Sequence, residues 1–169
     1  MLDINNKTIG DIFKEAATLW PNQIFFVSPK TNKTPLITVS YIEALNRMTE
    51  YKEELLNAGY GYGERIALLL GNRVEHYLIK LAANNLGISV VPINPNASSN
   101  EILYILNDSG AALTITDQTH LSLMESVAKI ASSTIKFCDI DNSLQSFPTK
   151  TKNIIIKKVN PSNESSLLY

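Results

Sequence analysis

The glycine-rich stretch GYGYG, at residues 59–63, is the first candidate for chemistry in this sequence. Glycine-rich loops hold phosphate groups when their backbone amides converge on the anion and a helix N-terminus follows. Here a helical pattern precedes the glycines and a strand pattern follows them, so no helix N-terminus faces the loop. We therefore predict that Gly59 ends a helix and that the stretch turns the chain into a strand.

The other reactive side chains stand apart from one another along the chain. His76 and His120 have no Cys or His partner at metal-site spacing, so both are predicted to be solvated or partly packed. Cys138, the single cysteine, is expected to be a small buried side chain. Glu101 and Asp108 resemble a carboxylate pair, but a helix cap and a packed helix end explain them better. We predict no catalytic, cofactor-binding or metal-ligating residue in this chain.

The elements that carry these residues alternate between strand and helix patterns. Continuous apolar runs are typical of strands buried on both faces, and they occur at 64–70, 88–94, 111–116 and 134–140. Helical patterns with an apolar stripe separate them, at 71–87, 101–110 and 120–131. Strand–helix–strand repeats with short connections imply a parallel sheet covered on both faces. The predicted fold class is α/β, doubly wound, with a mostly parallel sheet and helices on both faces.

The region before these repeats is predicted to add two helices and a hairpin. Residues 8–20 carry a helical stripe, and runs at 23–29 and 36–40 flank turn-forming residues. A second helix extends from residue 41 to Gly59.

Two helices are predicted to begin with a capping box, in which a hydroxyl and a carboxylate three residues later each bond the other's backbone amide. Ser40 and Glu43 form the first pattern, and Ser98 and Glu101 form the second.

The composition excludes several classes of protein. Of 169 residues, 44% are hydrophobic and 18% are charged, which is ordinary for one globular domain and argues against disorder. The formal net charge of −1 gives no field that would attract nucleic acid or an anionic membrane. The first residues lack the pattern of a signal peptide, and no apolar stretch is long enough to span a bilayer. We expect a cytoplasmic protein with no nucleic-acid partner.

The pattern becomes less regular over residues 139–169, although the whole chain, 1–169, is predicted to form a single α/β subdomain. The run NIIIKK at 153–158 is compatible with a short strand, and ESSLLY at 164–169 reads as the beginning of another.

From Ile37 to Thr116 the sequence resembles the N-terminal portion of the adenylate-forming superfamily, which includes acyl-CoA synthetases, luciferases of the firefly type and the adenylation domains of peptide synthetases. The resemblance is carried by an ordered series of motifs. They are GERIALLL at 63–70, GNRVEH at 71–76 with Asn72 and Glu75, VVPINP at 90–95 and ILNDSGA at 105–111.

The resemblance implies a two-step reaction of a longer parent protein, in which a carboxylate and ATP form an acyl-adenylate that a thiol, usually coenzyme A, then attacks. It implies ATP, Mg²⁺ and coenzyme A for the parent and none for this chain. In the family a segment like 164–169 leads into a Thr/Ser/Gly-rich phosphate loop, so this chain is expected to be a fragment that is inactive alone. The expected partners are the rest of the enzyme and a second copy bound through the C-terminal face.

Several alternatives remain open on the sequence. VVPINP favours the CoA-ligase branch, because amino-acid-activating domains more often have Asp where Asn94 stands. A fragment of such an adenylation domain, a stand-alone binding or scaffold module, and an unrelated flavodoxin-like domain are the other interpretations. The sequence does not indicate which carboxylic acid the parent would activate.

Overall fold

The computed structural model describes residues 6–28, 35–142, 146–150 and 154–169. These residues form five helices, α1 (Ile9–Leu19), α2 (Tyr41–Asn57), α3 (Val74–Asn85), α4 (Ser99–Ser109) and α5 (Leu121–Ile130). They also form six strands, β1 (Ile24–Ser28), β2 (Ile37–Ser40), β3 (Arg65–Leu69), β4 (Ser89–Pro92), β5 (Leu113–Thr116) and β6 (Phe137–Asp139).

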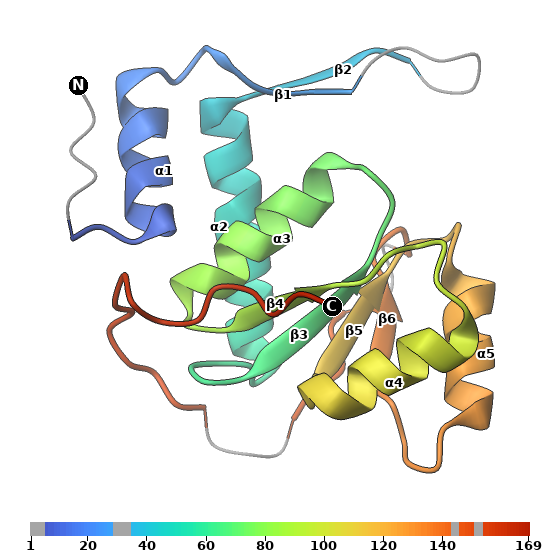
Figure 1. Ribbon diagram of the computed structural model, residues 1–169. Helices are drawn as coiled ribbons and strands as arrows, with labels where there is room; N and C mark the ends of the chain where they lie inside the picture. The colour runs from blue at the N-terminus through green and yellow to red at the C-terminus, as the bar shows by residue number, and fades with distance from the viewer. Residues whose placement is uncertain (1–5, 29–34, 143–145, 151–153) are drawn as a thin grey trace.

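Four of the strands form one parallel sheet in the order β4-β3-β5-β6 (Figure 1). In the register of the central strand, Ala67 pairs with Val91 on one side and with Thr114 on the other. The chain passes from β3 outward to β4 and then returns across β3 to β5, so the sheet is wound in both directions. The predicted α/β fold with a parallel sheet is confirmed.

Helices cover both faces of this sheet, which explains the continuous apolar runs of its strands. Ile66 and Leu68 of β3 lie in a core with α2 and α3, whereas Ala67 and Leu69 lie in a second core with α4 and α5. All four side chains are fully buried. Burial of both faces removes the polar alternation that a half-exposed strand would show.

The first strands form a separate two-stranded sheet, which Figure 1 shows at one end of the molecule beside α1 and α2. β1 and β2 are antiparallel, and Val27 pairs with Thr38. The predicted hairpin is therefore confirmed, although most of its predicted turn lies outside the described residues.

Capping boxes begin three helices. The two predicted boxes are confirmed: the hydroxyls of Ser40 and Ser98 accept hydrogen bonds from the Glu43 and Glu101 amides. The third box, which was not predicted, opens α1. There the Thr8 hydroxyl accepts from the Asp11 amide at 3.1 Å, and the Thr8 amide donates to the Asp11 carboxylate at 3.1 Å.

Of the two strand-like runs in the C-terminal stretch, the first does not form a strand over its described residues and the second pairs with β4 through one bridge. The expected strand at 153–158 is absent from its described residues, 154–158, where the Ile155 carbonyl instead accepts a hydrogen bond from the Tyr62 amide at 2.9 Å. The end of the chain lies alongside the edge strand β4 (Figure 1), where Val90 bonds the Ser165 carbonyl and the Leu167 amide. The Leu167 backbone is therefore paired within the same chain.

Candidate functional site

The first place to look for a site is the switch point between the carboxyl ends of β3 and β5, where the winding of the chain along the sheet changes direction. Ligands of doubly wound sheets bind in the crevice outside such a switch point. In this chain the loops at 70–73 and 117–120 meet there, since β3 and β5 are adjacent and parallel.

A buried carboxylate joins these two loops. Asp117 is only 4% exposed, and its Oδ2 accepts a hydrogen bond from the Gly71 amide at 3.1 Å. Its Oδ1 accepts from the His120 amide at 3.1 Å and lies 2.6 Å from Nδ1 of the His120 ring. His120 is thus partly packed, as predicted, but its carboxylate partner was not foreseen. The pair orients the imidazole and fixes both loops.

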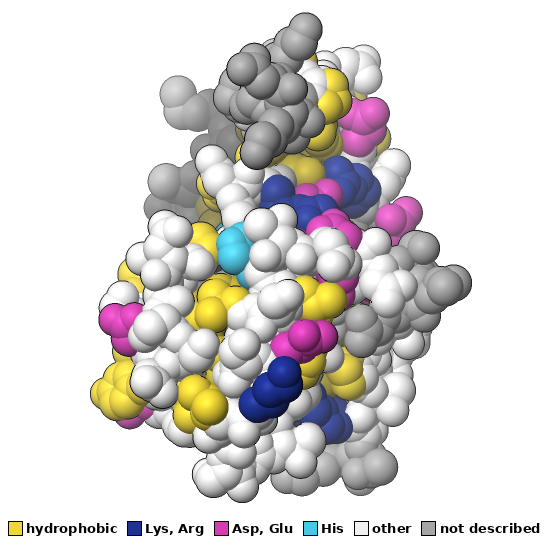
Figure 2. Space-filling view, turned by 90° about the vertical axis from the view of Figure 1, so that its right-hand side faces the viewer, with side chains coloured by type: hydrophobic (Ala, Val, Ile, Leu, Met, Phe, Trp, Pro, Cys, Tyr) yellow, Lys and Arg dark blue, Asp and Glu magenta, His cyan; other side chains and the backbone are white. Residues whose placement is uncertain are grey.

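Charged side chains continue along the same edge as a network of ion pairs. Arg73 lies 2.6 Å from Glu75 and 2.8 Å from Asp141, and Glu75 also pairs with Arg47 of α2. The Asp141 carboxylate accepts a further hydrogen bond from the Gln118 amide at 3.1 Å. Figure 2 shows the mixed signs, with basic and acidic side chains adjacent on the face that it presents.

The carboxylates of this network neutralise its two arginine side chains. Burial opposes ionisation of Glu75, but hydrogen bonds from Arg73 and Arg47 outweigh it and hold the pKa of Glu75 below its ordinary value. Because both guanidinium groups already have carboxylate partners, the edge has little positive charge to offer a triphosphate. Glu75, a residue of the family-like GNRVEH motif, has a structural role here.

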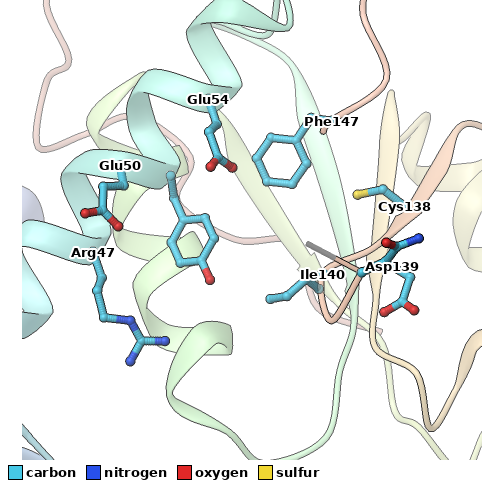
Figure 3. A pocket seen from close by; sticks show the side chains of 9 residues that line it. Arg47, Glu50, Glu54, Cys138, Asp139, Ile140 and Phe147 are labelled. Atoms are coloured by element: carbon cyan, nitrogen blue, oxygen red, sulfur yellow. The ribbon is translucent and has the colours of Figure 1, made fainter. Parts of the chain in front are cut away.

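A polar pocket of about 220 Å³ lies between α2 and the segment that follows β6. Figure 3 shows Glu54 of α2 facing Phe147 and Cys138 across it. Burial raises the pKa of the Cys138 thiol to about 12, and it raises the pKa of Glu54, which also lies near Glu50. The thiol is therefore held in its neutral form, which is a poor nucleophile. The prediction that Cys138 is a small buried side chain is confirmed.

The GYGYG loop has the predicted turn geometry. Gly59 and Gly63 have φ angles of +93° and +81°, which favour glycine. The Gly61 amide donates to the Glu64 carboxylate at 2.8 Å and the Gly63 amide to the Gly87 carbonyl at 3.0 Å. Its amides are therefore directed at acceptors of the chain and form no phosphate cradle.

The remaining predicted residues lie apart from one another. Glu101 is part of its helix cap, as expected. Asp108 instead accepts a hydrogen bond from the Tyr169 hydroxyl at 2.5 Å. His76 is partly packed, and burial lowers its pKa, with Lys80 adding to the effect. Within the described part of the chain, no three His, Cys, Asp or Glu side chains are grouped as metal ligands.

The comparisons with known proteins identify the family. The model of the AMP-binding enzyme family matches residues 13–168. The chain belongs to this family. The long-chain-fatty-acid–CoA ligase FadD13 of Mycobacterium tuberculosis is 33% identical over 110 residues, which are 64% of this chain and 21% of that protein. Tyrocidine synthase 2 of Brevibacillus parabrevis is 27% identical over 97% of this chain and 4% of its own.

Solved structures of relatives have the same fold. A fatty acyl CoA synthetase of Mycobacterium tuberculosis superposes with a TM-score of 0.77 at 23% identity, over 96% of this chain and 32% of that one. O-succinylbenzoate coenzyme A synthetase of Bacillus subtilis, solved in complex with ATP and a magnesium ion, superposes with a TM-score of 0.68 at 23% identity, over 91% and 37% of the two chains.

The match covers only part of each relative. The chain spans about one fifth of FadD13 and about one third of the superposed structures. Among the described residues, no helix has the length and apolar character needed to cross a membrane.

Proposed function

We propose that this chain forms the N-terminal sheet region of an AMP-forming ligase that joins a carboxylic acid to coenzyme A. The single observation that carries the proposal is the family match over residues 13–168. The superposition of a solved fatty acyl CoA synthetase on 96% of the chain supports it through the fold. In the proposed reaction the carboxylate displaces pyrophosphate from ATP, and the thiol then displaces AMP.

The chain's own contribution is structural. Its strands and the network around Arg73 and Glu75 hold the carboxyl edge of the sheet in a fixed arrangement. Neither the switch point nor the polar pocket combines a nucleophile, a base and unpaired cations. We therefore expect chemistry on ATP to use residues outside the described part of this chain.

A second candidate is activation of an amino acid, as favoured by the match of tyrocidine synthase 2 to 97% of the chain. Asn94 was expected to discriminate between the two branches. The structure gives it a local role, because its Oδ1 accepts the Asn96 amide at 3.0 Å and closes the turn after β4. Aspartate serves the same turn equally well, so this position favours neither branch.

Exchange of labelled pyrophosphate into ATP tests the proposal on two samples. The purified 169-residue chain, offered a panel of fatty, aromatic and amino acids, should show no exchange above a heat-denatured control. Protein captured from the source cells with an antibody against this chain should show exchange with one acid class.

The acid that supports exchange decides between the candidates. Fatty or aromatic acids, followed by thioester formation with coenzyme A, support the ligase. Amino acids alone support the second candidate. Captured protein that is inactive with every acid, or activity of the isolated chain, contradicts the proposal.

A further inference from the structure

An apolar groove of about 370 Å³ lies at the end of the molecule that carries the β1–β2 hairpin. It is formed between α1, α3 and the start of α2, beside the β1–β2 hairpin, the region at the upper left of Figure 1. Its lining consists of Ile9, Ile12, Phe13, Ala16, Trp20, Phe25, Tyr41, Tyr77, Lys80 and Leu81.

Three aromatic rings from three different elements make the groove rigid. Phe13 of α1 and Phe25 of β1 meet edge to face with centroids 5.0 Å apart, and Tyr41 of α2 lies 5.9 Å from the first ring and 5.4 Å from the second. Such contacts fix ring orientations without long flexible side chains. The groove is thus preformed, and its volume lies in the lower part of the range of small-molecule sites.

Part of the lining of the groove is exposed to solvent. Trp20 is 37% exposed and Tyr77 is 45% exposed, although both are large apolar side chains. Exposed apolar side chains that line one groove are typical of a surface that binds a ligand or a partner.

The polar groups of the groove restrict what that could be. Lys80 is the only charged residue of the lining, and its ammonium group has no hydrogen bond or ion pair with the described residues. No carboxylate lines the groove, so a cationic ligand would find no partner there. An anionic group placed at Lys80 would gain a charge-assisted hydrogen bond.

We propose that this groove binds an amphiphilic carboxylate, such as a medium-chain fatty acid, with its acyl chain on the aromatic floor and its carboxylate at Nζ of Lys80. An acyl chain has no polar group along its length, so its burial in an apolar groove leaves no hydrogen-bonding group unsatisfied. The site does not depend on the proposed ligase function, because none of its lining residues belongs to the loops at 70–73 and 117–120 or to the ion-pair network.

Trp20 provides a direct test, since it is the only tryptophan of the sequence and lines the groove. Medium-chain carboxylates brominated along the chain, titrated below their micelle concentration, should quench Trp20 fluorescence saturably. Each added methylene should tighten binding about two- to fourfold until the groove is filled. The matched neutral alcohol should bind more weakly than the carboxylate.

Three variants separate the charge from the apolar floor. Lys80→Gln should weaken carboxylate binding about five- to tenfold and leave alcohol binding unchanged. Ile12→Gln should weaken both ligands. Lys129→Gln, on the exposed surface of α5, should change neither. Far-UV circular dichroism checks that each variant keeps its helices.

The outcomes are distinct. Equal binding of carboxylate and alcohol, equal binding by Lys80→Gln, or tighter binding of an alkyltrimethylammonium ion of the same length would overturn the proposal. Quenching that rises linearly without saturation would show non-specific adsorption and would overturn it as well. Failure of the pyrophosphate-exchange experiment would leave this result unaffected, because the two rest on different residues.

Discussion

The thiol of Cys138 illustrates how much a side chain's chemistry depends on its surroundings. It is buried in the core, and desolvation, with the neighbouring Asp139, raises its pKa from 9.0 to about 12. The native chain should therefore resist alkylation by iodoacetamide at pH 8. One equivalent should react after unfolding in guanidinium. Mass spectrometry measures the rate of labelling in both states. Labelling of the native protein as fast as that of the unfolded chain would contradict this account.

The same thiol predicts a loss of stability at alkaline pH. Its pKa is higher in the folded chain than in the unfolded chain, so above pH 9 the unfolded state releases a proton that the folded state retains. The contribution of Cys138 is complete below pH 9 and is lost as the pH rises toward 12, by at most about 1.4 kcal/mol per pH unit. Urea unfolding of Cys138→Ala should show a shallower decline between pH 9 and 10.5. If stability fell equally steeply with pH in the native chain and in Cys138→Ala, the thiol would be excluded as a cause of the alkaline loss of stability.

Glu75 should matter more to stability than other carboxylates of the helices, because it lies between Arg73 and Arg47. Glu75→Gln should lower the free energy of unfolding by about 1–3 kcal/mol, since it leaves two guanidinium groups close together. The lowered pKa of Glu75 means that its contribution is present above pH 4.5 and declines as the pH falls below it.

Glu53→Gln is the matched control, because Glu53 is exposed on α2. Urea titrations at pH 7 should show little change for this variant. A loss of stability as large as that of Glu75→Gln would exclude the network as the cause.

For single residues, the roles that depend on neighbours in the sequence could be predicted, and those that depend on residues far away in the sequence could not. The cap of Ser98 and Glu101 could be predicted because its partners are three residues apart. The pair of Asp117 and His120 has the same spacing, but the Gly71 amide that completes it is 46 residues away. Only the pairing of β3 with β5 brings that amide within reach.

Among the elements, the turn between α2 and β3 offers a comparison of two glycines. A Cβ atom on Gly61 would lie 2.7 Å from both Ile154 Cγ2 and the Ile155 carbonyl oxygen, whereas one on Gly63 would have no atom within 4 Å. Gly61→Ala should therefore displace the 154–155 segment. Gly63→Ala should cost only the strain of its positive φ, about 1–2 kcal/mol.

Hydrogen exchange of the Tyr62 amide distinguishes the two effects, because that amide donates to the Ile155 carbonyl. Gly61→Ala should accelerate its exchange more than the overall change in stability explains. Gly63→Ala should accelerate it only in proportion to that change. Equal behaviour of the two variants would contradict the packing of the segment against the turn.

The order of the elements was predictable because each strand of the sheet is buried on both faces and each helix has one apolar stripe. The last residues were harder, since a single strand-like run does not reveal its partner. Ser165 and Leu167 pair with Val90, which is about 75 residues earlier in the chain. The run at 154–156 has high β propensity, but it packs against the Gly61 turn, and tertiary contacts override propensity here.

On the scale of the whole molecule, apolar surface remains exposed at the C-terminal face, defined by Tyr104, Leu168 and Tyr169. Leu168 is 74% and Tyr104 is 63% exposed, and the rings of Tyr104 and Tyr169 meet with centroids 6.4 Å apart. Burying such a surface recovers about 25 cal/mol per Å² before the costs of association are subtracted. We therefore propose that the isolated chain self-associates through this face, as a dimer or larger assembly.

Light scattering coupled to gel filtration at micromolar concentration should give a mass above that of one chain. The doubly substituted chain Tyr104→Ser, Leu168→Ser should be a monomer.

Leu167 is left unchanged because it packs against the core between the sheet and α4, so its replacement would disturb the fold. Ile130→Ser is the matched control, since Ile130 is a half-exposed apolar residue on α5. It should retain the assembly, because it removes apolar surface away from the proposed contact. A monomeric native chain, or an assembly that survives the double substitution, would show that this face does not drive association.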